Sequence, residues 1–271
     1  MIFWWYNLYN NRSYLQYFQD LRRRVIRIVI TLVILVIIIT TFSIRIIDYG
    51  PYKVAILYPD LFNNIAIQTM ALMRHDLLPH NVTLIQTSPG QAFFAQVYVA
   101  ALLALIFTIP VMTREIISFI GPGLYRRERL FIKKMTLVSV LLFGLGCSFS
   151  YFVVIPLVLE FLYKYGEIIG VATFLDISQF VPFVLQFLLA FGISYQLPLI
   201  MWGFTISGFV RPKFWRNNLR YVIVILAIFG AIVTPDGSGI TMWFVAGPMI
   251  LLYLVGIFTI ERKTRNLAQE I

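Results

Sequence analysis

The chain has 271 residues, of which 60% are hydrophobic and only 13% are charged, and its net charge at pH 7 is +10. A water-soluble domain carries about 25% charged residues, so this composition excludes a soluble globular protein. The long apolar runs are continuous, whereas a transmembrane β-barrel would show alternating segments of about ten residues. We therefore predict an all-α, polytopic membrane protein.

Six segments are apolar enough to be membrane spans. In chain order they cover about residues 25–47, 93–117, 135–159, 180–207, 221–233 and 242–260. The fifth is short, because its helix would reach about 20 Å against a hydrocarbon thickness of about 30 Å. It is expected either to thin the bilayer locally or to pack at one side of the bundle. No linker divides the chain, so residues 1–271 are predicted to form a single membrane domain.

The longest connection, about residues 48–92, is half apolar. Loops of this length without secondary structure of their own are uncommon. We expect this large outer loop to fold into short helices on the outer face of the membrane.

The positive charges are distributed unevenly between the connections. All but four of the 22 Lys and Arg residues fall in the two terminal tails, the second–third connection or the fourth–fifth connection; the exceptions are Arg45, Lys53, Arg74 and Lys164. Segments rich in Lys and Arg stay on the cytoplasmic side, so both termini are predicted to be cytoplasmic. A basic inner face attracts anionic lipid headgroups, which accounts for the net charge without nucleic-acid binding.

The sequence contains no motif for a catalytic nucleophile, a phosphate-binding loop or a zinc-binding helix. His75 and His80 have no supporting carboxylate cluster. We therefore predict no enzymatic activity, no metal and no cofactor.

Two carboxylates stand out on the basic inner face: Asp20, in YFQDLRRRV, and Glu128, in GPGLYRRERLF. Each has a local explanation, in the helix dipole and in basic residues about one turn away, such as Arg24 after Asp20. If the bundle brings the two together, they could instead accept two guanidinium groups through charge-assisted hydrogen bonds.

Gln196, in AFGISYQLPL, is a polar residue at membrane depth. It is expected either to hydrogen bond to another helix of the bundle or to line a wetted groove.

Taken together, these stretches resemble the TatC family, the C subunit of the twin-arginine protein translocase. YFQDLRRRV is similar to the family motif H-L-x-E-L-R-x-R-L, and FIGPGLYRRERL is similar to the block F-x-x-P-G/A-L-Y-x-x-E-R/K. SYFVVIPLVLEF, AFGISYQLPL and TPDG resemble further blocks in the same order. This chain has Asp20 and Gln196 where the family usually has glutamate, and Tyr17 where it usually has histidine.

The resemblance implies a concave, glove-like scaffold of six helices that binds the twin-arginine signal peptide of folded cargo at the cytoplasmic surface. It implies use of the proton-motive force, small single-span subunits of the A and B type as partners, and self-association in a multi-subunit complex. The membrane would be that of a prokaryotic cell, with an organellar inner or thylakoid membrane as the alternative. A secondary transporter and a membrane scaffold without cargo remain the competing functions.

Motif matches imply the residues of the site. Those expected to bind the signal peptide are Glu128, Asp20, Arg22, Phe119, Pro122 and Leu124. Those expected to act within the membrane or toward partners are Gln196, Tyr151, Phe94 and Asp236.

Overall fold

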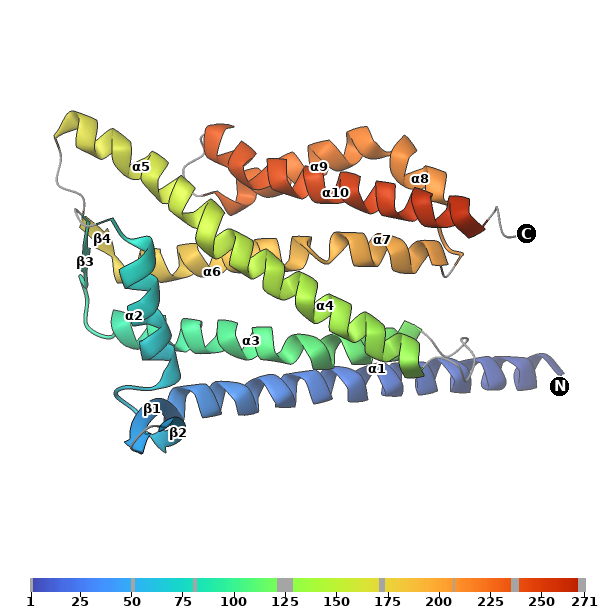
Figure 1. Cartoon of the computed structure of the whole chain (residues 1–271). Helices are drawn as coiled ribbons and strands as arrows, with labels where there is room; N and C mark the ends of the chain where they lie inside the picture. Colours follow the sequence, from blue (N-terminus) through green and yellow to red (C-terminus); the bar gives the residue numbers. More distant parts are fainter. Residues whose placement is uncertain are drawn as a thin grey trace.

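A computed structural model describes residues 2–49, 52–79, 82–120, 129–170, 174–206, 208–234 and 239–267 (Figure 1). The helices are α1 (Ile2–Thr41), α2 (Ile65–Leu77), α3 (Gln91–Ile120), α4 (Arg129–Phe149), α5 (Ile155–Ile169), α6 (Ile177–Ser194), α7 (Leu197–Ile206), α8 (Pro212–Asn217), α9 (Leu219–Val233) and α10 (Gly239–Leu267). A π-helical segment, η2 (Ser150–Val154), joins α4 to α5. The strands are β1 (Phe42–Tyr49), β2 (Tyr52–Pro59), β3 (Thr83–Ile85) and β4 (Phe174–Asp176).

Within those residues, five helical stretches are long and apolar enough to cross a membrane. They are Phe18–Thr41, Gln91–Ile116, Lys134–Lys164, Ile177–Thr205 and Gly239–Arg262, and α9 is a shorter apolar helix. With α9 as the short fifth span, the predicted membrane fold is confirmed. The start of α1 and the end of α10 lie at the same end of the bundle (Figure 1), which we call the inner end, opposite the outer end.

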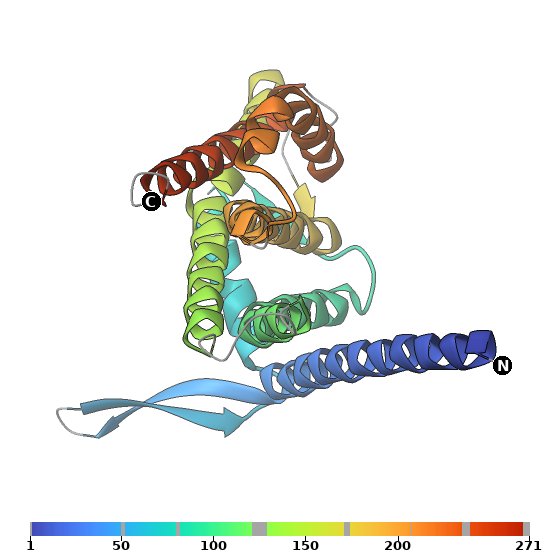
Figure 2. The same ribbon diagram turned by 90° about the vertical axis from the view of Figure 1, so that its right-hand side faces the viewer.

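The helices form a curved layer rather than a closed bundle. α1 packs on α3, α3 on α6, and α10 on both α7 and α9. The long α4–η2–α5 element crosses one face of this layer, where α4 contacts α3 and α6 (Figure 2). α1 lies at the edge of the layer, so most of its apolar surface is open to lipid.

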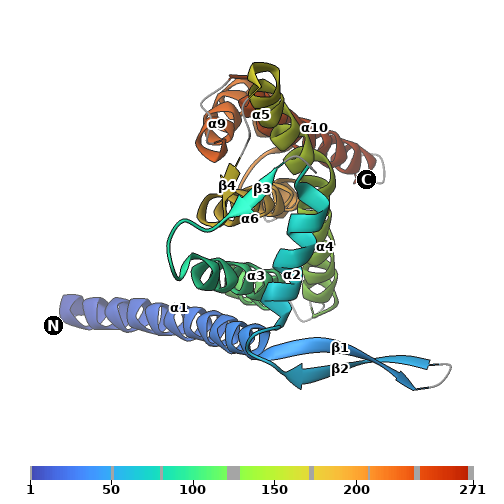
Figure 3. The same cartoon turned by 90° about the vertical axis from the view of Figure 1, so that its left-hand side faces the viewer.

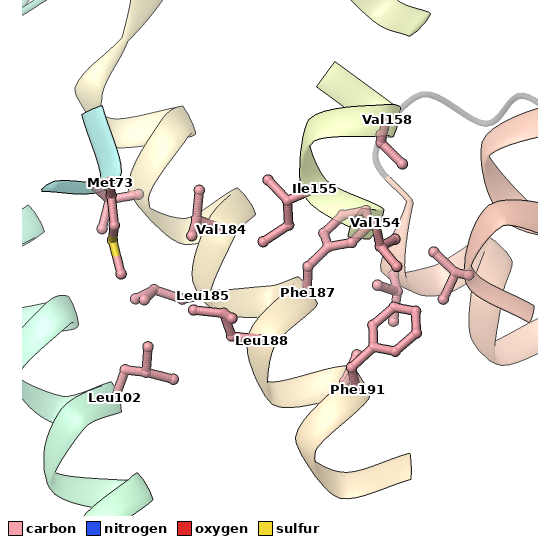
Figure 4. Packing of buried hydrophobic residues seen from close by; sticks show 14 of the residues in the cluster. Met73, Leu102, Val154, Ile155, Val158, Val184, Leu185, Phe187, Leu188 and Phe191 are labelled. Atoms are coloured by element: carbon pink, nitrogen blue, oxygen red, sulfur yellow. The ribbon is translucent and has the colours of Figure 1, made fainter. Parts of the chain in front are cut away.

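The core lies along one stripe of α6. Phe180, Val184, Phe187 and Phe191 are fully buried and recur at the three- and four-residue spacing of one helix face. Figure 4 shows this stripe packed against Ile155 and its neighbours on η2 and α5, with Leu102 of α3 on the other side. Lipid tails are as apolar as these side chains, so close packing rather than transfer from water favours their contact.

Two prolines account for irregularities in the long helices. The N–H of Ile155 donates to the C=O of Ser150, five residues earlier, and the next residue, Pro156, has no N–H to continue the ladder. Pro198 stands at the second position of α7, directly after the turn at Tyr195 and Gln196 that ends α6. Both elements continue across the membrane because each proline changes only the local hydrogen bonding.

The outer loop differs from the prediction. Among the described residues of the loop, α2 is the only one of the predicted short helices that is present. Residues 42–49 and 52–59 instead pair as an antiparallel hairpin (Figure 3). The first span therefore ends at Thr41 and not near residue 47. The sequence itself indicates a hairpin here, because two runs rich in β-branched and aromatic residues flank Gly50–Pro51, a dipeptide typical of turns. A short parallel pairing of β3 with β4 ties the rest of the outer loop to the start of α6.

Candidate functional site

Asp20 lies near the middle of α1, at the inner end of the membrane span Phe18–Thr41, and its side chain is 63% exposed. Its Oδ2 is 3.9 Å from Nη2 of Arg24, one turn later, so the local pair expected from the sequence is present. An exposed pair of this kind is worth at most about 1 kcal/mol, which leaves the carboxylate available to another cation. Arg22 is also exposed, but two residues correspond to about 200° around a helix. Asp20 and Arg22 therefore point to different sides of α1.

A buried carboxylate, Glu115, fixes α1 against α3. Its side chain is only 5% exposed and is paired with two arginines of α1. Nη1 of Arg24 donates to the Glu115 carboxylate (3.3 Å) and to the Glu115 carbonyl (3.2 Å), and Nη1 of Arg27 donates to the other carboxylate oxygen. Because Arg24 also faces Asp20, the same contact sets the orientation of Asp20 at the inner end.

The sequence analysis assigns no role to Glu115, although the position of this residue in the sequence indicates a buried ion pair. It follows Arg114 near the end of the apolar run that forms α3. An ionisable residue in such a run needs a partner. Which residue supplies that partner depends on the packing of α1 against α3, and spacing along one chain does not specify it.

Several residues of the predicted site have no described geometry. Glu128, Pro122, Leu124 and Asp236 lie outside the described residues. The backbone of Phe119 belongs to the last turn of α3, but its side chain is also outside them. α3 ends at Ile120 and α4 begins at Arg129, both at the inner end (Figure 1). The connection that carries Glu128 therefore joins two helices at the end of the bundle where Asp20 lies.

Gln196 joins helices through a hydrogen-bond network within the membrane. Oγ of Ser139, on α4, donates to Oε1 of Gln196 (2.8 Å), and Nε2 of Gln196 donates to the C=O of Ser139 (3.0 Å). Oγ1 of Thr113, on α3, lies 2.8 Å from the same Ser139 hydroxyl and is therefore the donor of that bond. This geometry corresponds to the first interpretation of Gln196, a hydrogen bond between helices.

Replacing Ser139 with alanine is expected to destabilise the bundle by about 1 kcal/mol. The change removes both hydroxyl hydrogen bonds but leaves the bond from Gln196 to the backbone, and such bonds between membrane helices average about 0.6 kcal/mol. Unfolding by SDS in mixed micelles measures the loss. Ser148→Ala, at an exposed position of the same helix, is the control, and an equal effect of the two changes would contradict the network.

Tyr151 connects the crossing helix to the outer loop. It belongs to η2, and its hydroxyl donates to Oδ2 of Asp76 on α2 (2.9 Å). Oδ1 of Asp76 lies 3.0 Å from Nδ1 of His75. The hydrogen bond with His75, and then the one from Tyr151, lowers the pKa of Asp76 below its ordinary value. Tyr151 therefore holds α2 over the outer end of the bundle.

Phe94 lines a groove of about 560 Å³ between the outer ends of α3 and α6. The groove is bounded by Gln91, Phe94, Ala95 and Tyr98 of α3 and by Ser178, Pro182, Leu185, Gln186 and Leu189 of α6. Phe94 is exposed there and meets Phe93 edge to face, with ring centroids 5.8 Å apart. The groove thus combines an aromatic wall with three polar side chains.

Asp176 caps α6 at the outer end. Its carboxylate accepts hydrogen bonds from the N–H (2.8 Å) and the hydroxyl (2.6 Å) of Ser178, and from the hydroxyl of Thr87. The hydrogen bonds from Ser178, followed by the one from Thr87, lower the pKa of Asp176 to about 2. The cap therefore joins α6 to the segment that precedes α3.

The stability of this outer contact is expected to depend on pH in the acid range. The pKa of Asp176 is lower in the folded chain than in the unfolded one, so the cap stabilises above about pH 4 and is lost as the pH falls toward about 2. Asp176→Asn should flatten the dependence of the melting temperature on pH between about 5 and 2. Glu160→Gln, which removes an exposed carboxylate of α5, is the control. A pH dependence unchanged by Asp176→Asn would contradict this assignment.

Comparison with known proteins identifies the family of this chain. The family model described as Sec-independent protein translocase protein (TatC) matches residues 16–248. A relative from Cenarchaeum symbiosum, named Sec-independent protein translocase protein TatC, is 49% identical over 251 residues, which are 93% of this chain and 95% of that protein. A relative of the same name from Aquifex aeolicus is 35% identical over 186 residues, 68% of this chain and 77% of that protein.

Solved structures agree with the sequence relatives. Two crystal structures of the twin arginine translocase receptor TatC, one of them in the detergent DDM, superpose on this chain with TM-scores of 0.75 and 0.74. They are 28% and 30% identical to it; the alignments cover 92% and 90% of this chain and 99% and 98% of those chains. The chain is therefore a multi-pass integral membrane protein that belongs to the TatC family of Sec-independent protein translocase proteins.

Proposed function

We propose that this chain is the signal-peptide receptor and core subunit of a translocase that moves folded proteins across an energised membrane. The proposal rests on the match of residues 16–248 to the TatC family. It is supported by an exposed carboxylate, Asp20, at an inner end that is rich in Lys and Arg. Solved relatives similar to this chain are described as twin arginine translocase receptors. The chain acts by binding cargo and forming the path across the membrane, not by catalysis.

The proposed binding site lies at the inner end of the first membrane span, on α1, and in the connection between α3 and α4. Glu128 is the principal ligand of the paired arginines and Asp20 the second, with Arg22, Phe119, Pro122 and Leu124 shaping the site. A guanidinium group forms two parallel hydrogen bonds with a carboxylate, whereas an ammonium group acts as a point charge. Two carboxylates among basic neighbours therefore select paired arginines over paired lysines.

The proposed partners within the membrane are small single-span subunits of the A and B type, with further copies of this chain in the same complex. Ile193 and Ile200 are exposed apolar residues on either side of Gln196, so a partner helix would contact them directly. A photo-crosslinker at Ile200 should capture a small single-span protein, whereas one at Leu141, exposed on α4, serves as the comparison. Capture of lipid alone at Ile200 would count against this surface.

The short span α9 supports the same function. Its 15 residues reach about 22 Å, less than the hydrocarbon thickness of about 30 Å. Val224, Ile225 and Ile228 are exposed on the outside of α9, and the helix packs on α10. A short helix that faces lipid favours local thinning of the bilayer, which would lower the barrier to cargo.

The proposed function is tested by transport into inverted membrane vesicles that contain this chain and an A-type subunit. A folded reporter with paired arginines in its signal peptide should enter energised vesicles, and the paired-lysine version should not. Dissipation of the proton-motive force should stop entry of the first. Equal entry of both reporters would contradict the proposal.

A further inference from the structure

The hairpin β1–β2 begins directly where a membrane span ends. The span Phe18–Thr41 has 24 residues, about 36 Å of helix, which is enough to carry Thr41 through about 30 Å of hydrocarbon. β1 begins at the next residue, Phe42. The root of the hairpin therefore lies at the outer surface of the bilayer.

The same root is held firmly to the bundle. The N–H of Asp60, after β2, donates to the C=O of Thr41 (2.9 Å). Nδ2 of the buried Asn64, which caps α2, donates to the C=O of Thr40 (2.8 Å). Both ends of the hairpin are thus fixed to the end of α1 at one depth.

The hairpin runs along the membrane surface rather than away from it. In Figure 1 the helices lie lengthwise and the hairpin is seen nearly end-on. In Figures 2 and 3, turned by 90°, the hairpin is seen at full length and extends beyond the bundle. Its direction is therefore across the spans. A hairpin rooted at the surface and running across the spans stays at the depth of the headgroups.

The two faces of the hairpin have different chemistry. Ile44 pairs with Leu57 and Ile46 with Ala55, so these side chains share one face. Ile44, Leu57 and Ile46 are 46%, 59% and 67% exposed. In the half of the hairpin nearest α1, this face, which we call the isoleucine face, is an apolar surface that no described part of the chain covers. Nearer the turn, the register places Asp48 and Lys53 on the same face.

The opposite face is mixed: it carries Arg45 and Tyr58 beside Val54 and Ile56, which are 43% and 40% exposed. The guanidinium of Arg45 lies over the ring of Tyr58, 4.5 Å from its centroid, and donates to Oδ2 of Asp60 (2.7 Å). An arginine beside a tyrosine is suited to the headgroup region, where both side chains keep a polar tip in water. In the half of the hairpin nearest α1, one face is therefore wholly apolar, whereas the other combines polar and apolar side chains.

We propose that the hairpin is an interfacial element whose isoleucine face lies among the lipids of the outer leaflet, with Arg45 and Tyr58 turned toward the headgroups and water. The occupant of this face is lipid, because the hairpin begins at the residue after a membrane span whose last turns, at Ile37 and Ile38, expose apolar side chains. The outer edges of a two-stranded hairpin have unpaired backbone groups, which hydrocarbon does not tolerate. The hairpin therefore stays at headgroup depth, and only its side chains reach about 5–10 Å inward.

The proposal is tested by the accessibility of spin labels on the full-length chain in vesicles of phosphatidylcholine and phosphatidylglycerol. Single cysteines are placed at Ile44, Ile46 and Leu57 on one face and at Val54 and Ile56 on the other, after Cys147→Ser. Oxygen, which concentrates in lipid, and a water-soluble nickel chelate are compared as relaxing agents. Labels at Ile37 and at Gln86, an exposed outer-loop residue, give the lipid and water references.

The expected result is an alternation between the two faces. Labels on the isoleucine face should resemble Ile37, with oxygen favoured several-fold over the nickel chelate, and labels at Val54 and Ile56 should resemble Gln86. Water-like values on both faces would overturn the proposal, as would lipid-like values on both. Exclusion of both agents at Ile46 would also overturn it, since a protein surface such as a second copy of the chain would then cover this face.

Discussion

Replacement of both Arg24 and Arg27 by methionine is expected to destabilise the packing of α1 on α3 by about 3–5 kcal/mol. The two changes leave the carboxylate of Glu115 buried without a counter-ion. Removing one side of a buried ion pair is strongly destabilising because the remaining charge is buried and uncompensated. SDS titration in mixed micelles gives the change in the free energy of unfolding.

Two further variants separate the charge from the packing. Adding Glu115→Leu to the double variant should recover most of the loss, because an apolar side chain leaves no charge uncompensated. Arg23→Met, at an exposed position of α1, should have little effect. If the triple variant is no more stable than the double variant, the contact between Glu115 and the two arginines is not what holds α1.

The second large effect is expected at Gly146, where α4 crosses α6. A Cβ atom at Gly146 would lie 2.7 Å from the backbone oxygen of Phe191. Because this neighbour is backbone, Gly146→Ala forces the helices apart, and we expect a loss of about 2–3 kcal/mol. Small residues at such crossings let membrane helices approach closely. The same SDS titration measures the effect.

The same helix supplies a matched control. A Cβ atom at Gly144 would meet nothing within 4 Å, so Gly144→Ala should be neutral or slightly stabilising, because alanine favours helix over glycine by about 1 kcal/mol. Equal destabilisation by the two substitutions would show that the close contact with Phe191 is not the cause.

The membrane fold is predictable from this sequence because each span is a long apolar run that must form its own backbone hydrogen bonds. The same reasoning fails at residues 42–59: apolar content predicts residues 42–47 as the end of the first span, and the loop that follows is predicted to form short helices. In the structure this segment is the hairpin β1–β2. Outside the hydrocarbon, strand pairing satisfies the backbone as well as a helix does, so hydrophobicity alone does not distinguish the two.

The site is predictable only in part. Local spacing is sufficient for the pair of Asp20 and Arg24, one helical turn apart. The pairing of Glu115 with Arg24 and Arg27 joins residues about 90 positions apart, and the network of Gln196 with Ser139 joins residues 57 apart. Contacts of this kind depend on which helices become neighbours, and one sequence without its fold does not determine that.

Peptide binding tests most directly whether carboxylates at the inner end select paired arginines. Dissociation constants are measured for a paired-arginine and a paired-lysine signal peptide, each with the wild-type chain and with Glu128→Ala, and with Glu160→Gln as control. A charge-assisted hydrogen-bonded contact is worth about 1.5–3 kcal/mol, so the wild type and the control should prefer arginine by about 10- to 100-fold. Glu128→Ala should lose most of that preference. Equal binding in all four combinations of peptide with wild type and Glu128→Ala would contradict the receptor site.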